Sequence, residues 1–178
     1  MTIEPLNIVF EPLTARDLPL LHQWLACPHV AKWWGPTPSL AEVEEDFLPS
    51  IAGTIAHHCY LAIRDAAPVG FIASYAPADW HHEGWWLDQH DPDVRGIDQF
   101  LAHSDQLDQG LGTAMIRTFV ARLFADPAVN RVQTDPSPAN RRAIRCYEKA
   151  GFRPVREIDT PDGRALLMVA DRPAHTQR

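Results

Sequence analysis

The sequence predicts an α+β fold, an α/β layer arrangement in which helices flank a single sheet. Seven apolar runs of strand length alternate with four segments of helical spacing, in the order β-α-α-β-β-β-α-β-α-β-β. The chain has 178 residues, of which 46% are hydrophobic. That is enough for one domain over 1–178, with a core from about 8 to 170 and a loose tail at 172–178.

The N-terminal part predicts one strand and two helices. Residues 8–13 form the strand-like run. The first helix starts either with a capping box that ends at Asp17 or with Asp17 as the N-cap and Pro19 in the first turn. A second capping box, from Ser39 to Glu42, opens the next helix.

The central part predicts three strands. Residues 59–63 and 69–75 flank Asp65-Ala-Ala-Pro68, which indicates a hairpin. Residues 78–93 form a polar, tryptophan-rich connection without a clear period, and residues 94–102 form the third strand.

The C-terminal part alternates helices and strands and ends in a hairpin. A glycine turn precedes a helix that stops at Asp126-Pro127. The last helix starts at Ser137-Pro138 and is capped by Gly151. The expected strands are residues 129–134, 152–158 and 165–170.

The overall composition excludes several classes of protein. The net charge is -7, from 16 basic and 23 acidic side chains, which disfavours nucleic acid as a partner. No run of apolar residues is long enough to span a membrane, and no secretory signal is visible at the N-terminus. Cys27, Cys59 and Cys146 show no metal or disulfide spacing, which fits a reducing cytoplasm.

The charges are distributed unevenly along the chain. Residues 79–108 are strongly acidic and residues 127–157 are mainly basic. These regions form either two solvated faces or one site that takes a cationic substrate and a phosphorylated cofactor.

The glycine turn Gln109-Gly-Leu-Gly-Thr113 lies between a strand and a helix. Backbone N–H groups at such a helix start attract phosphate oxygens. The turn lacks the Lys-Ser/Thr of a P-loop and the third glycine of a dinucleotide fold, so nucleotide hydrolysis and nicotinamide binding are disfavoured.

Followed at this distance by Asn140-Arg-Arg-Ala-Ile-Arg-Cys-Tyr-Glu-Lys-Ala-Gly-Phe152, the glycine turn resembles that of the GNAT-type N-acetyltransferases. The resemblance implies a mixed, mostly antiparallel sheet of about seven strands with four helices, and acetyl-CoA as co-substrate without a metal. Leu107 stands where the family usually has Gln or Arg. The implied cofactor-binding residues are Phe100, Leu101, Gln109, Gly110, Leu111, Gly112, Thr113, Asn140 and Tyr147.

Further motifs resemble the aminoglycoside 6'-N-acetyltransferases, in particular the branch that modifies kanamycin and tobramycin. They are Trp33-Trp34-Gly35, Gly84-Trp85-Trp86, Asp91-Pro-Asp-Val-Arg-Gly-Ile-Asp98-Gln99, Gln133-Thr-Asp135-Pro-Ser-Pro and Thr160-Pro-Asp162-Gly163. The resemblance implies antibiotic resistance as the function, with a cationic aminoglycoside and acetyl-CoA as partners of a monomer or homodimer. Acylation of another amine, such as a hydroxylysine or polyamine, and a non-catalytic acyl-CoA-binding module are the alternatives.

Carboxylates and aromatic rings suit a polycationic sugar. The implied substrate-binding residues are Trp34, Glu83, Trp85, Asp98, Gln99, Asp135 and Asp162. Glu83 replaces the Asp usual in that branch. The plainer interpretation is that the carboxylates serve turns and caps and that the tryptophans, Trp86 above all, serve the core.

We expect direct attack of the 6'-amine on the acetyl group. Asp98 is the candidate base or positioning carboxylate, and Tyr147 is the candidate acid for the departing thiolate. A backbone N–H near Phe100 or Leu101 would hold the oxyanion. His57 and His58 face opposite ways if they lie in a strand, so a metal site is disfavoured.

Overall fold

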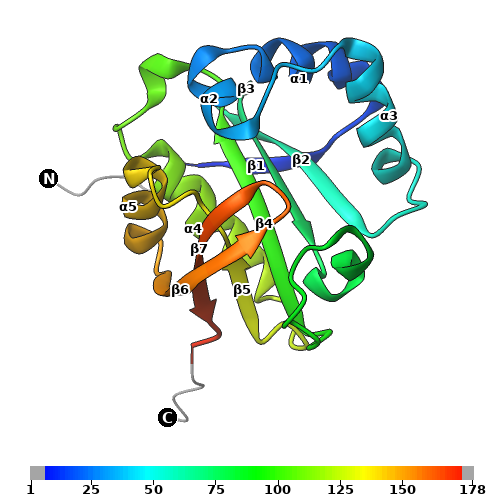
Figure 1. Ribbon diagram of the computed structural model, residues 1–178. Coiled ribbons are helices and arrows are strands. Elements are labelled where there is room, and N and C mark those ends of the chain that lie inside the picture. The colour runs from blue at the N-terminus through cyan, green and yellow to red at the C-terminus, as the bar shows by residue number, and fades with distance from the viewer. Residues whose placement is uncertain (1–6, 174–178) are drawn as a thin grey trace, which may run out of the picture. The chain divides into compact units, whose positions relative to one another are not determined.

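The computed structural model describes residues 7–173, and seven strands pair into one sheet. The strands are β1 (Val9–Pro12), β2 (His57–Arg64), β3 (Ala67–Tyr75), β4 (Val94–Leu101), β5 (Arg131–Thr134), β6 (Arg153–Thr160) and β7 (Gly163–Asp171). Their order is β1-β2-β3-β4-β5-β7-β6 (Figure 1). Because β4 pairs parallel with β5 while the β1–β2, β2–β3, β5–β7 and β6–β7 pairs are antiparallel, the mixed sheet is confirmed. The expected tail lies, from residue 174 on, outside the described residues.

Five α-helices and three short 3-10 helices occur within residues 7–173. The α-helices are α1 (Leu18–Leu25), α2 (Pro28–Trp34), α3 (Leu40–Ile51), α4 (Leu111–Leu123) and α5 (Arg141–Lys149). The 3-10 helices are η1 (Ala15–Asp17), η2 (Pro77–Glu83) and η3 (Ser104–Gln106). The sequence predicts four α-helices, and α2 is the additional one. At seven residues, α2 is too short to show an apolar repeat at i, i+3, i+4 and i+7.

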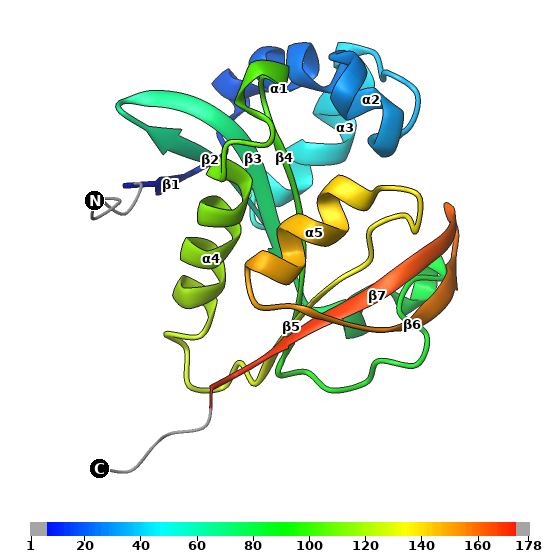
Figure 2. The same cartoon turned by 90° about the vertical axis from the view of Figure 1, so that its left-hand side faces the viewer.

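The chain divides into two compact units, and the first comprises the chain up to Tyr75 together with Asp98–Met115. Within it, α1, α2 and α3 lie on one side of β2 and β3 (Figure 2). Their buried side chains form one core with those of the strands. Members of that core are Leu18, Leu21, Trp24, Val30, Val43, Leu61, Phe71 and Phe100.

Local sequence signals start the helices of this unit. Ser39 and Glu42 form the expected capping box: the Ser39 backbone N–H donates to the Glu42 carboxylate at 2.7 Å, and the Glu42 N–H donates to Ser39 Oγ at 3.3 Å. At the first helix both expected arrangements occur in succession. Asp17 Oδ2 accepts from the Thr14 N–H at 2.8 Å and closes η1, and Asp17 then serves as the N-cap of α1, with Pro19 in its first turn.

The second unit comprises Ala76–Ile97 and the chain from Ile116 onward. Antiparallel pairing of β6 with β7 confirms the expected C-terminal hairpin, which turns between Thr160 and Gly163. The residue after α5 and its C-cap is Gly151, whose φ of 103° is unfavourable for other residues. Buried Phe119, Val132 and Met168 belong to the core of this unit.

Strands β3 and β4 approach each other closely in the first unit. The Ala102 N–H donates to the Val69 carbonyl at 2.9 Å. A Cβ atom on Gly70 would lie only 2.5 Å from the carbonyl oxygen of Phe100. Position 70 is therefore restricted to glycine by the backbone of the neighbouring strand. None of the helices in the described chain combines the length and hydrophobicity needed to cross a bilayer.

Candidate active site

Asp98 lies on β4, and its side chain is a carboxyl group with a strongly shifted pKa. The residue is half-buried, and desolvation raises the pKa of its side chain to about 6 from an ordinary value of 3.8. A carboxyl group with such a pKa exchanges a proton near neutral pH, as a general base must. Gln99, the next residue, is also half-buried, while Phe100 and Leu101 are buried.

An aromatic wall stands on the same face of β4 as Asp98. Phe100 lies two residues after Asp98, so both side chains leave the strand on the same side. The Phe100 ring stacks on Phe71 at a centroid distance of 5.5 Å. Trp34 meets Phe100 edge-on at 4.9 Å and Phe71 at 5.9 Å, and 39% of its surface stays exposed. The structure therefore places the accessible indole of Trp34 next to the segment that carries Asp98.

The glycine turn precedes α4 as expected. Gly110 has a φ of 82°, and its carbonyl accepts the Ala114 N–H at 3.0 Å, which closes the first turn of the helix. N–H groups in the first turn of a helix lie outside the helix's own hydrogen-bond ladder and favour an anion. Because the Gln109 side chain donates to the Asp105 carbonyl, backbone groups of Gly110, Leu111, Gly112 and Thr113 carry the anion-binding potential.

In the second unit, the loop after η2 touches the β6–β7 turn. A Cβ atom on Gly84 would lie 3.4 Å from Pro161 Cγ. Glu83, the last residue of η2, precedes Gly84, and Asp162 follows Pro161, so the structure brings these two exposed carboxylates onto neighbouring segments. The Asp162 N–H donates to Thr160 Oγ1 at 3.2 Å, which confirms that Asp162 is also a turn residue.

Asp135 follows β5 and is tied to the same loop through Gln133. The Gln89 side-chain amide donates to Gln133 Oε1 at 3.2 Å. The Gln89 backbone carbonyl accepts from His81 Nε2 at 2.7 Å, with the imidazole taken as the Nε2–H tautomer. Gln133 is 2% exposed and its Nε2 has no hydrogen-bond partner. The loop that bears Trp85 is thus anchored to the strand that precedes half-buried Asp135.

Helix α5 carries the remaining predicted residues. Asn140 caps it, because its Oδ1 accepts the Ala143 N–H at 3.2 Å. Tyr147 is buried, with 4% of its surface exposed, and meets Phe152 edge-on at 5.3 Å. The exposed Arg141 and Arg145 give this helix a basic surface.

The structure therefore gathers the predicted residues into two groups. Trp34, Asp98, Gln99 and the glycine turn belong to the first unit, and Glu83, Trp85, Asp135, Asn140, Tyr147 and Asp162 belong to the second. Trp85 is half-buried, whereas Trp86 is 9% exposed, so the core interpretation holds for Trp86. Among residues 7–173, no three His, Cys, Asp or Glu side chains gather to hold a metal ion.

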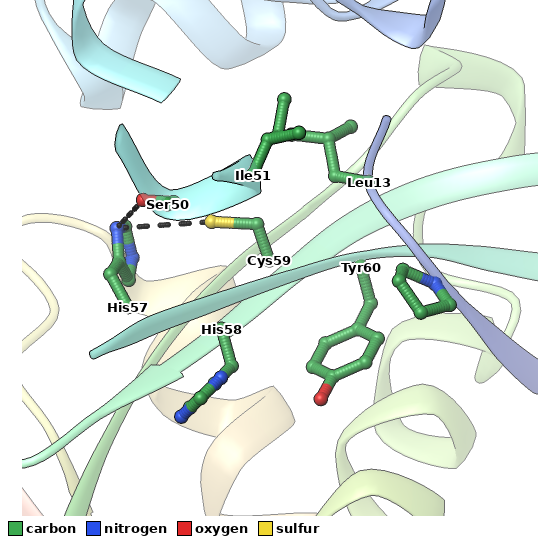
Figure 3. A pocket seen from close by; sticks show the side chains of 8 residues that line it. Leu13, Ser50, Ile51, His57, His58, Cys59 and Tyr60 are labelled. Atoms are coloured by element: carbon green, nitrogen blue, oxygen red, sulfur yellow. Dashed lines mark hydrogen bonds between the residues drawn. The ribbon is translucent and has the colours of Figure 1, made fainter. Parts of the chain in front are cut away.

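Three polar residues of the first unit meet in a way that the sequence does not predict. Ser50 Oγ lies 3.3 Å and Cys59 Sγ lies 3.8 Å from His57 Nδ1 (Figure 3). Strand alternation places His57 and Cys59 on one face, but only the fold shows that α3 brings Ser50 to them.

Comparison with known proteins places the chain in a family. The acetyltransferase (GNAT) domain family matches residues 14–160. An aminoglycoside N(6')-acetyltransferase type 1 from Klebsiella pneumoniae is 46% identical over 171 residues, covering 94% of this chain and 85% of the relative. The crystal structure of AAC(6')-Ib with coenzyme A and kanamycin superposes with a TM-score of 0.88 at 45% identity, covering 93% of this chain and 95% of the other.

A lysine N-acyltransferase from Mycolicibacterium paratuberculosis is more distant, at 28% identity over 168 residues that cover 88% of this chain and 70% of the relative. The chain is therefore an acetyl-CoA-dependent GNAT acetyltransferase and belongs to the aminoglycoside 6'-N-acetyltransferases.

Proposed function

We propose that the protein transfers an acetyl group from acetyl-CoA to the 6'-amine of an aminoglycoside antibiotic by direct attack, and so confers resistance. The observation that carries this proposal is the carboxyl group of Asp98, whose pKa of about 6 suits proton transfer near neutrality. An aromatic wall made by Trp34 and Phe100 stands on the same face of the sheet and offers a flat surface to a sugar ring.

Each step has a residue assigned to it. Asp98 takes a proton from the 6'-ammonium group, and the freed amine nitrogen bonds to the acetyl carbon. A backbone N–H at Phe100 or Leu101 stabilises the oxyanion of the tetrahedral intermediate. The C–S bond then breaks, and Tyr147 donates its phenolic proton to the coenzyme A thiolate. The amide product loses its second proton to solvent.

The glycine turn supports the binding of coenzyme A. Its pyrophosphate would accept hydrogen bonds from the backbone of Gly110, Leu111, Gly112 and Thr113 at the start of α4. Leu107 supplies no charge at the position where the family usually has Gln or Arg, so the backbone is the main contributor. Asn140 and Tyr147 would flank the thiol end.

The acidic loops support recognition of a polycation. Glu83 ends η2 and Asp162 lies in the β6–β7 turn, two segments that touch through Gly84 and Pro161. The loop after Glu83 is anchored to the strand that precedes Asp135. We assign these three carboxylates to amino groups of the drug, Trp34 and Trp85 to its rings, and Gln99 to a hydroxyl or amine.

We also propose that the enzyme acts in the cytoplasm, as a single domain and as a monomer or homodimer. Cys27, Cys59 and Cys146 are free thiols, as a reducing compartment maintains them. Acetyl-CoA is a product of central metabolism in that compartment.

A thiol-release assay with acetyl-CoA tests the function. We expect turnover with kanamycin and no turnover with a matched aminoglycoside that carries a 6'-hydroxyl group. Hydroxylysine and spermidine serve as the competing acceptors. Preferential acetylation of either one would replace the aminoglycoside assignment, and absence of thiol release with every amine would indicate a binding module.

A further inference from the structure

A small polar cavity lies on the face of β2 that α3 covers. It has a volume of about 110 Å³. His57 and Cys59 point towards Ser50 of α3, whereas His58 and Tyr60 point to the opposite side of the strand (Figure 3). His57 Nδ1 lies 3.3 Å from Ser50 Oγ and 3.8 Å from Cys59 Sγ. A neutral imidazole with an unprotonated Nδ1 accepts a hydrogen bond from such groups.

The strand register connects this cavity to Asp98. Cys59 pairs with Ala73 across the β2–β3 ladder. On the other side of β3, the bond from the Ala102 N–H to the Val69 carbonyl and the stacking of Phe71 on Phe100 define an antiparallel register. Continuing that register by two residues places Ala73 opposite Asp98.

Cys59 and Asp98 therefore flank one alanine on the same face of the sheet. Ala73 is buried, and its single methyl group leaves room for the two side chains to approach. Electrostatic repulsion by Asp98 adds to burial in raising the pKa of the Cys59 thiol to about 12, which places the two groups within electrostatic range.

The two titratable groups of the cavity, His57 and Cys59, stay uncharged at the pH at which Asp98 ionises. Burial lowers the pKa of His57 to about 4, so its imidazole is neutral whenever Asp98 can ionise. The other titratable groups of the first unit on elements next to Asp98 are Tyr75 of β3; His58, Tyr60 and Arg64 of β2; His29 of α2, whose Nε2 is 2.9 Å from the Leu101 carbonyl oxygen, and Lys32 of the same helix; and Glu42, Glu44, Glu45 and Asp46 of α3. The two permanent cations among these groups are engaged elsewhere: Arg64 pairs with Asp65 at 3.4 Å, and Lys32 lies over the Trp33 ring at 4.9 Å.

We propose that Ser50, His57 and Cys59 form a positioning cluster for Asp98, an uncharged wall that keeps counter-ions away from its carboxylate. The proposal rests on the proposed role of Asp98 as the base. A cation next to a carboxyl group lowers the pKa of that group. Its carboxylate form is then a weaker base and accepts a proton poorly from an amine. An uncharged wall preserves the basicity of Asp98, and the side chains at 57 and 59 then set the pH at which the enzyme becomes active.

Charge substitutions within the cluster test the proposal. His57→Lys adds a cation and Cys59→Asp adds an anion, while His57→Gln and Cys59→Ser are the matched neutral variants. Cys146→Asp, on α5 of the other unit, controls for added charge in general. The ionisation of Asp98 is followed by NMR of ¹³C-labelled aspartate, assigned with Asp98→Asn, alongside the pH profile of kcat/KM.

We expect the midpoint of the Asp98 carboxyl titration to fall by about one pH unit or more in His57→Lys and to rise by about as much in Cys59→Asp. The neutral variants and Cys146→Asp should stay within about 0.3 pH units of the wild type. The acid limb of kcat/KM should move with the NMR midpoint.

An Asp98 midpoint that does not respond to a charge at 57 or 59 overturns the proposal, as does an equal response to the neutral variants. If Cys59→Asp fails to fold, His57→Lys decides the matter, because residue 57 is only half-buried. The NMR titration needs no catalysis, so it stands even if Asp98→Asn retains wild-type turnover and thereby refutes the role of Asp98 as base.

Discussion

Replacing Asp98 by Asn should weaken catalysis and strengthen the fold at the same time. The pKa of Asp98 is about 6 in the folded protein and 3.8 ordinarily, a gap of about two units. Because the folded state holds this proton more tightly than the unfolded state, ionisation of Asp98 destabilises the fold as pH rises from about 4 to 6. At about 1.4 kcal/mol per unit, the cost above pH 6 reaches about 3 kcal/mol.

Asparagine keeps the shape of the side chain and removes that cost. We expect Asp98→Asn to be more stable than wild type at pH 8 by at least about 1 kcal/mol, with about 3 kcal/mol as the upper bound because an amide is also desolvated. Each 1 kcal/mol corresponds to about 2–4 °C in Tm for a chain of this size. At pH 4, where Asp98 is protonated, the two proteins should have similar stability.

Urea unfolding at pH 4 and pH 8 measures this difference, and thiol release measures turnover. We expect kcat to fall about 100-fold or more while the affinity for acetyl-CoA changes little. Asp91 provides a matched contrast: a hydrogen bond from Asn130 lowers its pKa, so Asp91→Asn should destabilise the protein at pH 8. Equal stability of Asp98→Asn and wild type at pH 8, or nearly intact turnover, would refute the reasoning.

Four more substitutions probe the proposed site. Tyr147→Phe should lower kcat by about 10²-fold or more if the phenol protonates the thiolate, and rates that match wild type at every pH would remove that role. Gly110→Ala should raise KM for acetyl-CoA. Gly53 is the matched control, because it has a similar φ of 71° and equally open surroundings: Gly53→Ala should lower stability about as much as Gly110→Ala but leave KM unchanged. Asp135→Asn and Asp162→Asn should raise KM for the aminoglycoside several-fold with little change in kcat. The assay is run at low salt, where exposed charges are least screened. An unchanged KM would mean that both residues have purely structural roles.

Local patterns predict most of the fold. The Ser39 capping box, the glycine turn at 109–113 and the hairpin around residues 160–163 each depend on a few neighbouring residues, and all three form as expected. Helix α2 is missed because seven residues show too little periodicity. The hairpin predicted around residues 65–68 forms as expected, and it turns at Asp65 and Ala66, which both take positive φ although neither is a glycine.

The candidate site is predicted less completely. The roles expected of Asp98, Tyr147 and the glycine turn come from residue types, their order and the family resemblance, and they stay predictions. The environment of Asp98 cannot be predicted in this way, because desolvation depends on which side chains α3 and β2 bring near it. The meeting of Ser50, His57 and Cys59 depends on the β2–β3 register and on helix packing, which link residues far apart in the sequence.

The contact at Gly70 limits how this enzyme could diversify under drug selection. Loops that carry Glu83 or Asp162 tolerate exchange, because exposed side chains there face little steric constraint. Any other residue at position 70 would push on the Phe100 carbonyl and shift the strand on which Asp98 sits. New drug specificities should therefore arise from the acidic loops, while glycine persists at position 70 in every active descendant.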